Sequence, residues 1–157
     1  MARDDAGGGM KRGKGRVQDA LVPCEEACRH LGESLGMIER EKPSSAVYSV
    51  LFDACVKRFE VLFEYAWKLL KVASEFQGRE APGPRPAIQE GLRFGWIEDA
   101  DFWADALDAR NASVHDYFGM TQQDYLKIMG RFAGEVGTLM KKIGQLTEDG
   151  PAPTRHR

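Results

Sequence analysis

The sequence predicts an all-α protein, an up-and-down four-helix bundle with one short additional helix. In four long stretches, apolar residues recur every three or four positions, which is the pattern of a helix with one buried face. Short breaks rich in Gly, Pro and Ser separate these stretches. No stretch shows the alternation of apolar and polar residues that is typical of a half-buried strand, so we expect no β-sheet.

Length and composition fit one domain of ordinary size. The chain has 157 residues, of which 43% are hydrophobic and 29% are charged, a balance typical of globular proteins. The net charge of −2 argues against a generally basic surface that coats nucleic acid. No run of about 18 apolar residues is present, so we expect no membrane-spanning helix. The three Cys are an odd number without zinc-ligand spacing, which favours free thiols in a cytoplasmic protein over a disulfide framework.

We expect three regions along the chain: a disordered tail over residues 1–16, the helical bundle over residues 17–147, and a second disordered tail over residues 148–157. The N-terminal tail is rich in Gly, Lys and Arg, a composition that cannot form a core. Its basic residues suit contact with RNA or with an acidic surface of a partner, or simply a solubilising role.

The first helix is expected to begin at Val22 or Pro23 and to end at Arg40, because Pro is tolerated in a first turn. The second is the longest, over residues 45–77, with a Ser as its N-cap. Its apolar face is wide, and four charged residues border it: Arg58, Glu60, Glu64 and Lys68. These side chains form either a solvated edge or a buried polar cluster that faces the motif described below.

Three further helices are expected after a loop rich in Pro and Gly over residues 78–86. A short helix covers residues 87–94. The fourth helix, which is long, begins at Asp99 or Asp101, either of which can cap it, and it carries the motif. The last helix covers residues 122–146, with an apolar stripe along its length.

The motif combines three reactive side chains within residues 108–117. Arg110 supplies a permanently charged fork that suits phosphate oxygens. His115 is the side chain type whose proton equilibrium lies near neutrality. Tyr117 carries a hydroxyl that can donate, accept or be modified. Together they could handle a phosphodiester without a metal, and no sequential metal-ligand motif or glycine-rich phosphate loop is present.

The spacing limits how Arg110 and His115 can meet. Five positions on a continuous helix turn a side chain by about 140°, which would point the two residues to different sides. They converge if the helix loosens near residues 111–113, whose types compete with backbone hydrogen bonds or pack weakly, or if two copies of the motif line one cleft in a dimer. The alternative is structural: Arg110 pairs with a carboxylate and His115 caps a helix end.

Two segments resemble a known family. Residues 58–71 resemble the signature RFE-x-x-FE-x-x-WK-x-x-K of the nucleotidyltransferase substrate-binding proteins. The Gly-Trp-Ile of residues 95–97, Trp103, and the pattern RN-x-x-x-H-x-Y over residues 110–117 resemble the same family's glycine turn, tryptophan and terminal motif. The resemblance covers about residues 17 to 146. It places the chain in the HEPN superfamily of small helical bundles, which usually form homodimers.

The resemblance implies a partner and site residues. Members of this family typically accompany a separately encoded minimal nucleotidyltransferase and bind its substrate. Related HEPN proteins are RNA-cleaving toxins, whose partner acts as antitoxin. By that resemblance, Arg110 and His115 would cleave RNA and the partner would adenylylate Tyr117. Asn111 and three second-helix residues would support binding: Arg58, Glu64 and Lys68.

Two departures from the family pattern concern the same motifs. Lys57 stands where glutamine is expected before the signature, and Asp116 stands where threonine is common. The acid at position 116 would place a negative charge beside an RNA cleft, which weighs against nuclease activity.

Two functions follow from the resemblance. The first is a non-catalytic partner subunit of a minimal nucleotidyltransferase, in a toxin–antitoxin-like pair. This chain lacks a Gly-Ser pair followed by an Asp-x-Asp motif, so it should not transfer nucleotides itself. The alternative is a metal-independent endoribonuclease that uses Arg110 and His115 and is neutralised by the partner. Both need no cofactor, and both use the same residues, so the sequence does not decide between them.

Overall fold

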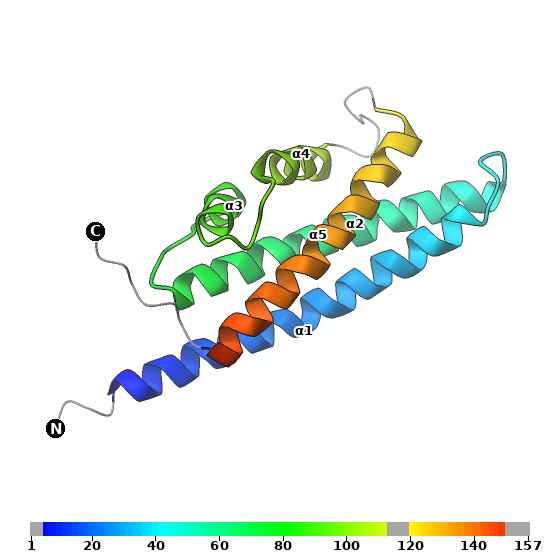
Figure 1. Cartoon of the computed structure of the whole chain (residues 1–157). Helices are drawn as coiled ribbons and strands as arrows, with labels where there is room; N and C mark the ends of the chain where they lie inside the picture. The colour runs from blue at the N-terminus through cyan, green and yellow to red at the C-terminus, as the bar shows by residue number, and fades with distance from the viewer. Residues whose placement is uncertain (1–4, 113–119, 150–157) are drawn as a thin grey trace.

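The computed structural model describes residues 5–112 and 120–149, which form five helices and no strand (Figure 1). The predicted all-α bundle is confirmed. Its helices are α1 (Asp5–Glu39), α2 (Ala46–Phe76), α3 (Pro84–Arg93), α4 (Ala100–Asn111) and α5 (Gln122–Asp149).

The described residues form three long helices and two short ones, whereas four long helices and one short one were expected. Helices α1 and α2 run antiparallel and side by side, and α5 packs across both of them (Figure 1). Helices α3 and α4 have only 10 and 12 residues, and both pack against α2. Helix α4 is shorter than expected because it ends at Asn111, before the second half of the motif.

The start of α1 differs most from expectation. The helix begins at Asp5 rather than at Val22 or Pro23, so the predicted start is wrong, and residues 5–16 are helical rather than a disordered tail. The reason is that the C-terminal end of α2 supports this segment. Val17 is fully buried, and Arg16 Nη2 lies 3.2 Å from Glu75 Oε2.

Sequence-specific caps fix the ends of α2 and α4. The hydroxyl of Ser45 accepts a hydrogen bond of 3.2 Å from the Val47 N–H at the start of α2. After α2, Gly78 has a φ of 82°, a left-handed backbone that favours glycine and lets the chain turn back. The Asp99 carboxylate accepts a hydrogen bond of 2.9 Å from the Phe102 N–H and so caps α4. Ser45, Gly78 and Asp99 are the residue types that these positions require.

The core lies where α2 and α5 meet α1 and α4, and aromatic rings fill its centre. The Phe63 and Phe132 rings stack with centroids 5.3 Å apart. Phe59 and Trp103 each meet Phe132 edge to face, at 5.4 Å and 4.9 Å. Such contacts add to the free energy of burial. None of the described helices is long and apolar enough to cross a membrane.

Candidate functional site

Arg110 lies in the last turn of α4, at the point where the chain leaves the helix. The Ala112 N–H still donates to the Asp108 carbonyl at 3.0 Å, but Ala112 itself has an extended backbone, with φ −62° and ψ 142°. Helix α4 therefore ends at Asn111, within residues 111–113, where the sequence predicted that the helix could loosen. His115, Asp116 and Tyr117 lie outside the described residues.

Helix α2 presents a carboxylate directly to Arg110. Arg110 Nη2 donates to Glu64 Oε2 at 2.8 Å. The same carboxylate accepts a hydrogen bond of 3.1 Å from Trp67 Nε1, and its other oxygen lies 3.2 Å from Lys68 Nζ. We call these four residues the Glu64 cluster. Asn111 extends it, because its side-chain oxygen accepts from Arg110 Nη1 at 3.2 Å.

Opposing effects set the protonation of Glu64. Partial burial raises the pKa of this carboxyl, but hydrogen bonds from Trp67 and Lys68 and the positive charges of Lys68 and Arg110 outweigh that effect. The net result is a pKa below the ordinary value. Glu64 is therefore ionised at neutral pH and holds Arg110 in an ion pair.

The Glu64 cluster is open to solvent. The side chains of Glu64 and Arg110 are 34% and 36% exposed, and that of Lys68 is 53% exposed. Two cations face one carboxylate, so the cluster carries one positive charge in excess. An approaching phosphate or carboxylate could contact Lys68 and Arg110 without removing Glu64. Among the described residues, no group of three or more His, Cys, Asp and Glu side chains could hold a metal ion.

The structure brings some of the predicted site residues together and leaves one apart. Glu64, Lys68 and Asn111 all meet Arg110 or share its partner. Arg58 faces α1 instead, where it donates to the His30 carbonyl at 2.8 Å and to the Ser34 hydroxyl. Arg58 therefore joins α1 to α2 and makes no recorded contact with the Glu64 cluster. The structural alternative had two parts, and the structure shows the first, the pairing of Arg110 with a carboxylate.

Sequence reasoning missed two residues that position this site. The apolar pattern of the second helix favours a core position for Trp67. Residues three positions apart on a helix are neighbours, however, so a contact between the Trp67 and Glu64 side chains could have been expected. The pattern likewise places Tyr125 only in an apolar stripe. The Tyr125 hydroxyl donates at 3.0 Å to the Ala109 carbonyl, immediately before Arg110. No sequence signal links α5 to α4 at this point.

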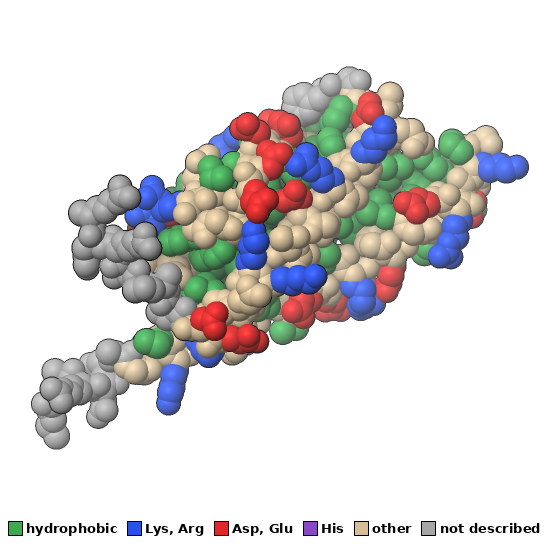
Figure 2. Space-filling view, in the orientation of Figure 1, with side chains coloured by type: hydrophobic (Ala, Val, Ile, Leu, Met, Phe, Trp, Pro, Cys, Tyr) green, Lys and Arg blue, Asp and Glu red, His purple; other side chains and the backbone are tan. Residues whose placement is uncertain are grey.

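Acidic side chains line the face of α4 that is exposed to solvent. Figure 2 shows red side chains gathered over α4 and the segment before it. Within α4, Asp101, Asp105 and Asp108 are exposed, and their spacing places them on one face of the helix. Asp105 and Asp108 also line a cavity of about 450 Å³ with Ala109, Met120 and Ile128. Anions are therefore favoured at the Glu64 cluster on the α2 side of Arg110, and disfavoured on the outer side of α4.

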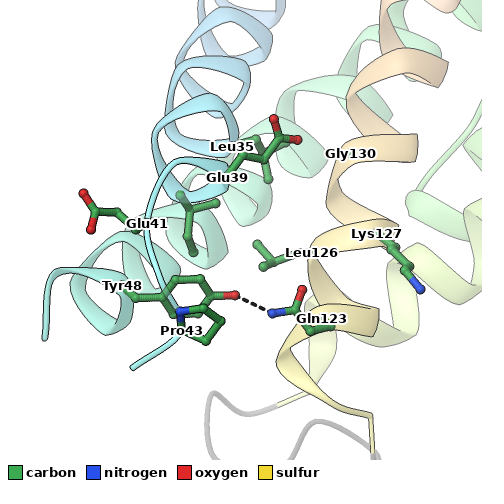
Figure 3. Close-up of a pocket in the computed structure, with 10 residues that line it drawn as sticks. Leu35, Glu39, Glu41, Pro43, Tyr48, Gln123, Leu126, Lys127 and Gly130 are labelled. Carbon is green, nitrogen blue, oxygen red and sulfur yellow. Dashed lines mark hydrogen bonds between the residues drawn. The ribbon is translucent and has the colours of Figure 1, made fainter. Parts of the chain in front are cut away.

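A second cavity lies at the far end of α1, away from the predicted site residues. It has a volume of about 500 Å³ and opens between the last turn of α1, the start of α2 and the start of α5 (Figure 3). Its floor is fixed by a hydrogen bond of 2.7 Å from Gln123 Nε2 to the Tyr48 hydroxyl. Glu39 and Lys127 border it without forming an ion pair among the described residues. Neither Arg110 nor any member of the Glu64 cluster lines this cavity.

The fold and the site define a small helical bundle with an open, positively charged cluster on α2 and α4. A family model described as "Nucleotidyltransferase substrate binding protein like" matches residues 20–145. The chain belongs to this family, as its two sequence motifs predicted. The matched range contains all of α2, α3 and α4, and therefore every residue of the Glu64 cluster.

A solved structure supports the fold independently. A crystal structure of a protein from Thermus thermophilus is similar, with a TM-score of 0.64 and 24% sequence identity, and the match covers 76% of this chain and 98% of that one. This likeness concerns the fold alone. The search of curated proteins found no match.

Proposed function

We propose that this chain is the substrate-binding subunit of a separately encoded minimal nucleotidyltransferase, in a toxin–antitoxin-like pair. The observation that carries the proposal is the family match, which spans every helix that builds the Glu64 cluster. The partner supplies the catalytic carboxylates and the nucleotide, and this bundle supplies the surface that holds the second substrate.

The Glu64 cluster is the proposed contact with that substrate. Arg110 and Lys68 offer charged donors to a phosphate or carboxylate, and Asn111 offers an amide within 3.2 Å of Arg110. Glu64 keeps the Arg110 side chain in one place, so less conformational entropy is lost when an anion binds.

The test is co-expression with a minimal nucleotidyltransferase encoded beside this chain. We expect the two proteins to co-elute in size-exclusion chromatography. Lys68→Ala and Arg110→Ala should leave the complex intact while weakening nucleotide transfer to its substrate. Arg85→Ala, which removes an exposed arginine paired with Asp108, is the matched control and should transfer normally. Two proteins that elute separately at micromolar concentration, with transfer unaffected by this chain, would refute the proposal.

The alternative is a metal-independent endoribonuclease, and the partly exposed position of Arg110 at the end of α4 favours it. In that function His115 removes the proton from a ribose 2′-hydroxyl, and Arg110 stabilises the charge that builds on the phosphate. A second histidine, from the other subunit of a homodimer, protonates the leaving oxygen. Arg110→Ala and His115→Ala should each abolish RNA cleavage that survives chelation, without loss of helical content. Equal cleavage by both variants and the wild type would exclude this site.

Tyr117 is the proposed point at which the partner acts on this chain. Its hydroxyl oxygen would attack the α-phosphorus of ATP, pyrophosphate would leave, and the hydroxyl proton would pass to a base or to water. The added phosphodiester would compete for Arg110 with an RNA phosphate. Incubation with the active partner, ATP and magnesium should add an adenylyl mass to the Tyr117 peptide, and Tyr117→Phe should prevent it. An unmodified peptide beside a demonstrably active partner would disprove this step.

A further inference from the structure

The first turns of α1 carry an unusual concentration of positive charge. Lys11, Arg12, Lys14 and Arg16 fall within six positions, and no Asp or Glu occurs between Asp5 and Asp19. In a chain whose net charge is −2, this segment stands out from its surroundings. We call residues 7–16 the basic segment.

The basic segment projects past the end of α2. Gly13 lies against the last residue of α2, because a Cβ on it would come within 3.0 Å of the Phe76 ring. The turns before Gly13 extend beyond the rest of the bundle (Figure 1), and residues 7–12 are exposed. Lys11, Arg12 and Arg16 are therefore exposed to solvent, and Lys14 is partly exposed.

Most of these charges have no ion-pair partner among the described side chains. Arg16 pairs with Glu75 at 3.2 Å. Among the residues whose side chains the structure describes, no carboxylate pairs with Lys11, Arg12 or Lys14. Lys11, Arg12 and Lys14 therefore remain available to another molecule.

The helix geometry arranges the cations in two ridges. At about 100° per residue, Lys11 and Lys14 share one side, and Arg12 and Arg16 share another. Gly8 and Gly15 lie between the ridges, and a Cβ on either would meet nothing within 4 Å. Bare backbone between two cationic ridges lets a charged strand approach closely.

We propose that the basic segment binds the phosphate backbone of a nucleic acid. The dense and unpaired positive charge matches a polyanion. The positive charges lie on two sides of the helix. This arrangement fits between two rows of phosphates along a nucleic-acid groove better than it fits a flat acidic protein surface. Met10 is the single large apolar residue in the segment, so it lacks the apolar face that binding to a membrane surface requires. Contacts to phosphate oxygens carry no sequence information, so the proposed binding is independent of sequence.

This site is separate from the Glu64 cluster. Glu64 and Glu75 lie eleven positions apart on α2, about 16 Å along the helix axis. The acidic face of α4 lies beside the Glu64 cluster but not beside the basic segment. Nucleic-acid binding here does not depend on a nucleotidyltransferase partner or on RNA cleavage.

The test is fluorescence anisotropy of a labelled 20-base-pair DNA duplex with the full chain, at salt concentrations from 50 to 200 mM. Three phosphate contacts, from Lys11, Arg12 and Lys14, predict that log K falls with log[salt] with a slope of about −2.7. The variant Lys11→Gln/Arg12→Gln/Lys14→Gln should bring the slope close to zero and bind at least about tenfold more weakly at 50 mM salt. Hydrogen exchange should show protection gained at residues 7–16 when the duplex binds.

The matched control is Arg40→Gln/Lys42→Gln/Lys127→Gln. It removes the same number of Arg and Lys side chains, all exposed, from another part of the chain, and it should bind like the wild type. Circular dichroism establishes that both variants keep their helical content and melting temperature. Absence of wild-type binding at 50 mM salt, or equal loss in both variants, would overturn the proposal. Equal binding of wild type to phosphatidylserine vesicles would point to a membrane surface instead and would also overturn it.

Discussion

The hydroxyl of Tyr125 in α5 donates a hydrogen bond of 3.0 Å to the carbonyl oxygen of Ala109 in α4. Tyr125 is only 2% exposed, and its ring meets the edges of Phe52 and Phe59. Since Ala109 directly precedes Arg110, this bond links the end of α4 to the buried face of α5. The position of Arg110 therefore depends on a residue of a different helix.

Tyr125→Phe should lower the free energy of unfolding by about 0.5–1.5 kcal/mol, the usual net value of one hydrogen bond. The ring contacts remain, so the loss isolates the hydroxyl. Urea denaturation followed by circular dichroism measures it. Tyr65→Phe is the control, because Tyr65 is 38% exposed and makes no recorded hydrogen bond among the described residues. A Tyr125→Phe midpoint equal to that of Tyr65→Phe would show that the bond contributes nothing.

Glu64→Gln should destabilise the protein at neutral pH but not in acid. The pKa of Glu64 is lowered in the folded state, so ionised Glu64 favours folding at pH values above about 4.5, the ordinary value. This stabilisation is lost as the pH falls through the lower folded-state pKa. The cluster is partly exposed, so we expect a difference of about 0.2–1 kcal/mol at pH 7. Unfolding of both proteins at pH 7 and near pH 3 tests this, and a difference that grows in acid would contradict it.

Gly91→Ala should destabilise the protein by about 1–3 kcal/mol. A Cβ at this position would lie 2.8 Å from Ile97 Cδ1 and 2.9 Å from Leu70 Cδ2, and both neighbours are buried. Gly134→Ala is the matched control in α5. A Cβ there meets nothing within 4 Å, so the helix should gain up to about 1 kcal/mol. Thermal melts of the two variants should move in opposite directions, and a shared direction would refute the packing argument.

The buried cysteines should resist thiol reagents in the native protein. Burial raises the pKa of Cys24 to about 12 and that of Cys55 to about 11, so almost no thiolate is present at pH 8. Cys28 is half-buried and its pKa is also raised by burial. Iodoacetamide at pH 8, followed by peptide mass mapping, should label Cys28 first, and Cys24 and Cys55 only after unfolding. Fast native labelling of Cys24 would contradict its burial.

The bundle itself could be predicted because its central helices bury continuous apolar stripes. The stripe of α5, which includes Met129, Phe132 and Val136, is fully buried, and its spacing alone indicates a helix. The start of α1 could not be predicted in the same way. Its turns bury little besides Val17 and contain several glycines, which are poor helix formers, so neither apolar periodicity nor helix propensity indicates a helix there.

The sequence draws attention to three residues of the Glu64 cluster, but it does not predict how they contact one another, and their role in binding stays a prediction. The sequence singled out Glu64, Lys68 and Arg110 from two separate motifs. The pairing of Glu64 with Arg110 joins residues 46 positions apart, and no spacing rule predicts a contact at that separation. Arg58 shows the converse, because it belongs to the same motif as Glu64 yet lies on a face of α2 that meets α1.

Pro23 lies inside α1, a helix of 35 residues. Proline has no N–H, so the carbonyl of Asp19 lacks the partner that position 23 would otherwise give it. If α1 unfolds from its glycine-rich N-terminal end, it reaches a missing backbone hydrogen bond just after Val17, at the Asp19 carbonyl. Residues before Pro23 and residues after it should exchange their amide hydrogens as two units of different stability. A transient loss of the first unit would release the basic segment as a tether while the bundle stayed folded.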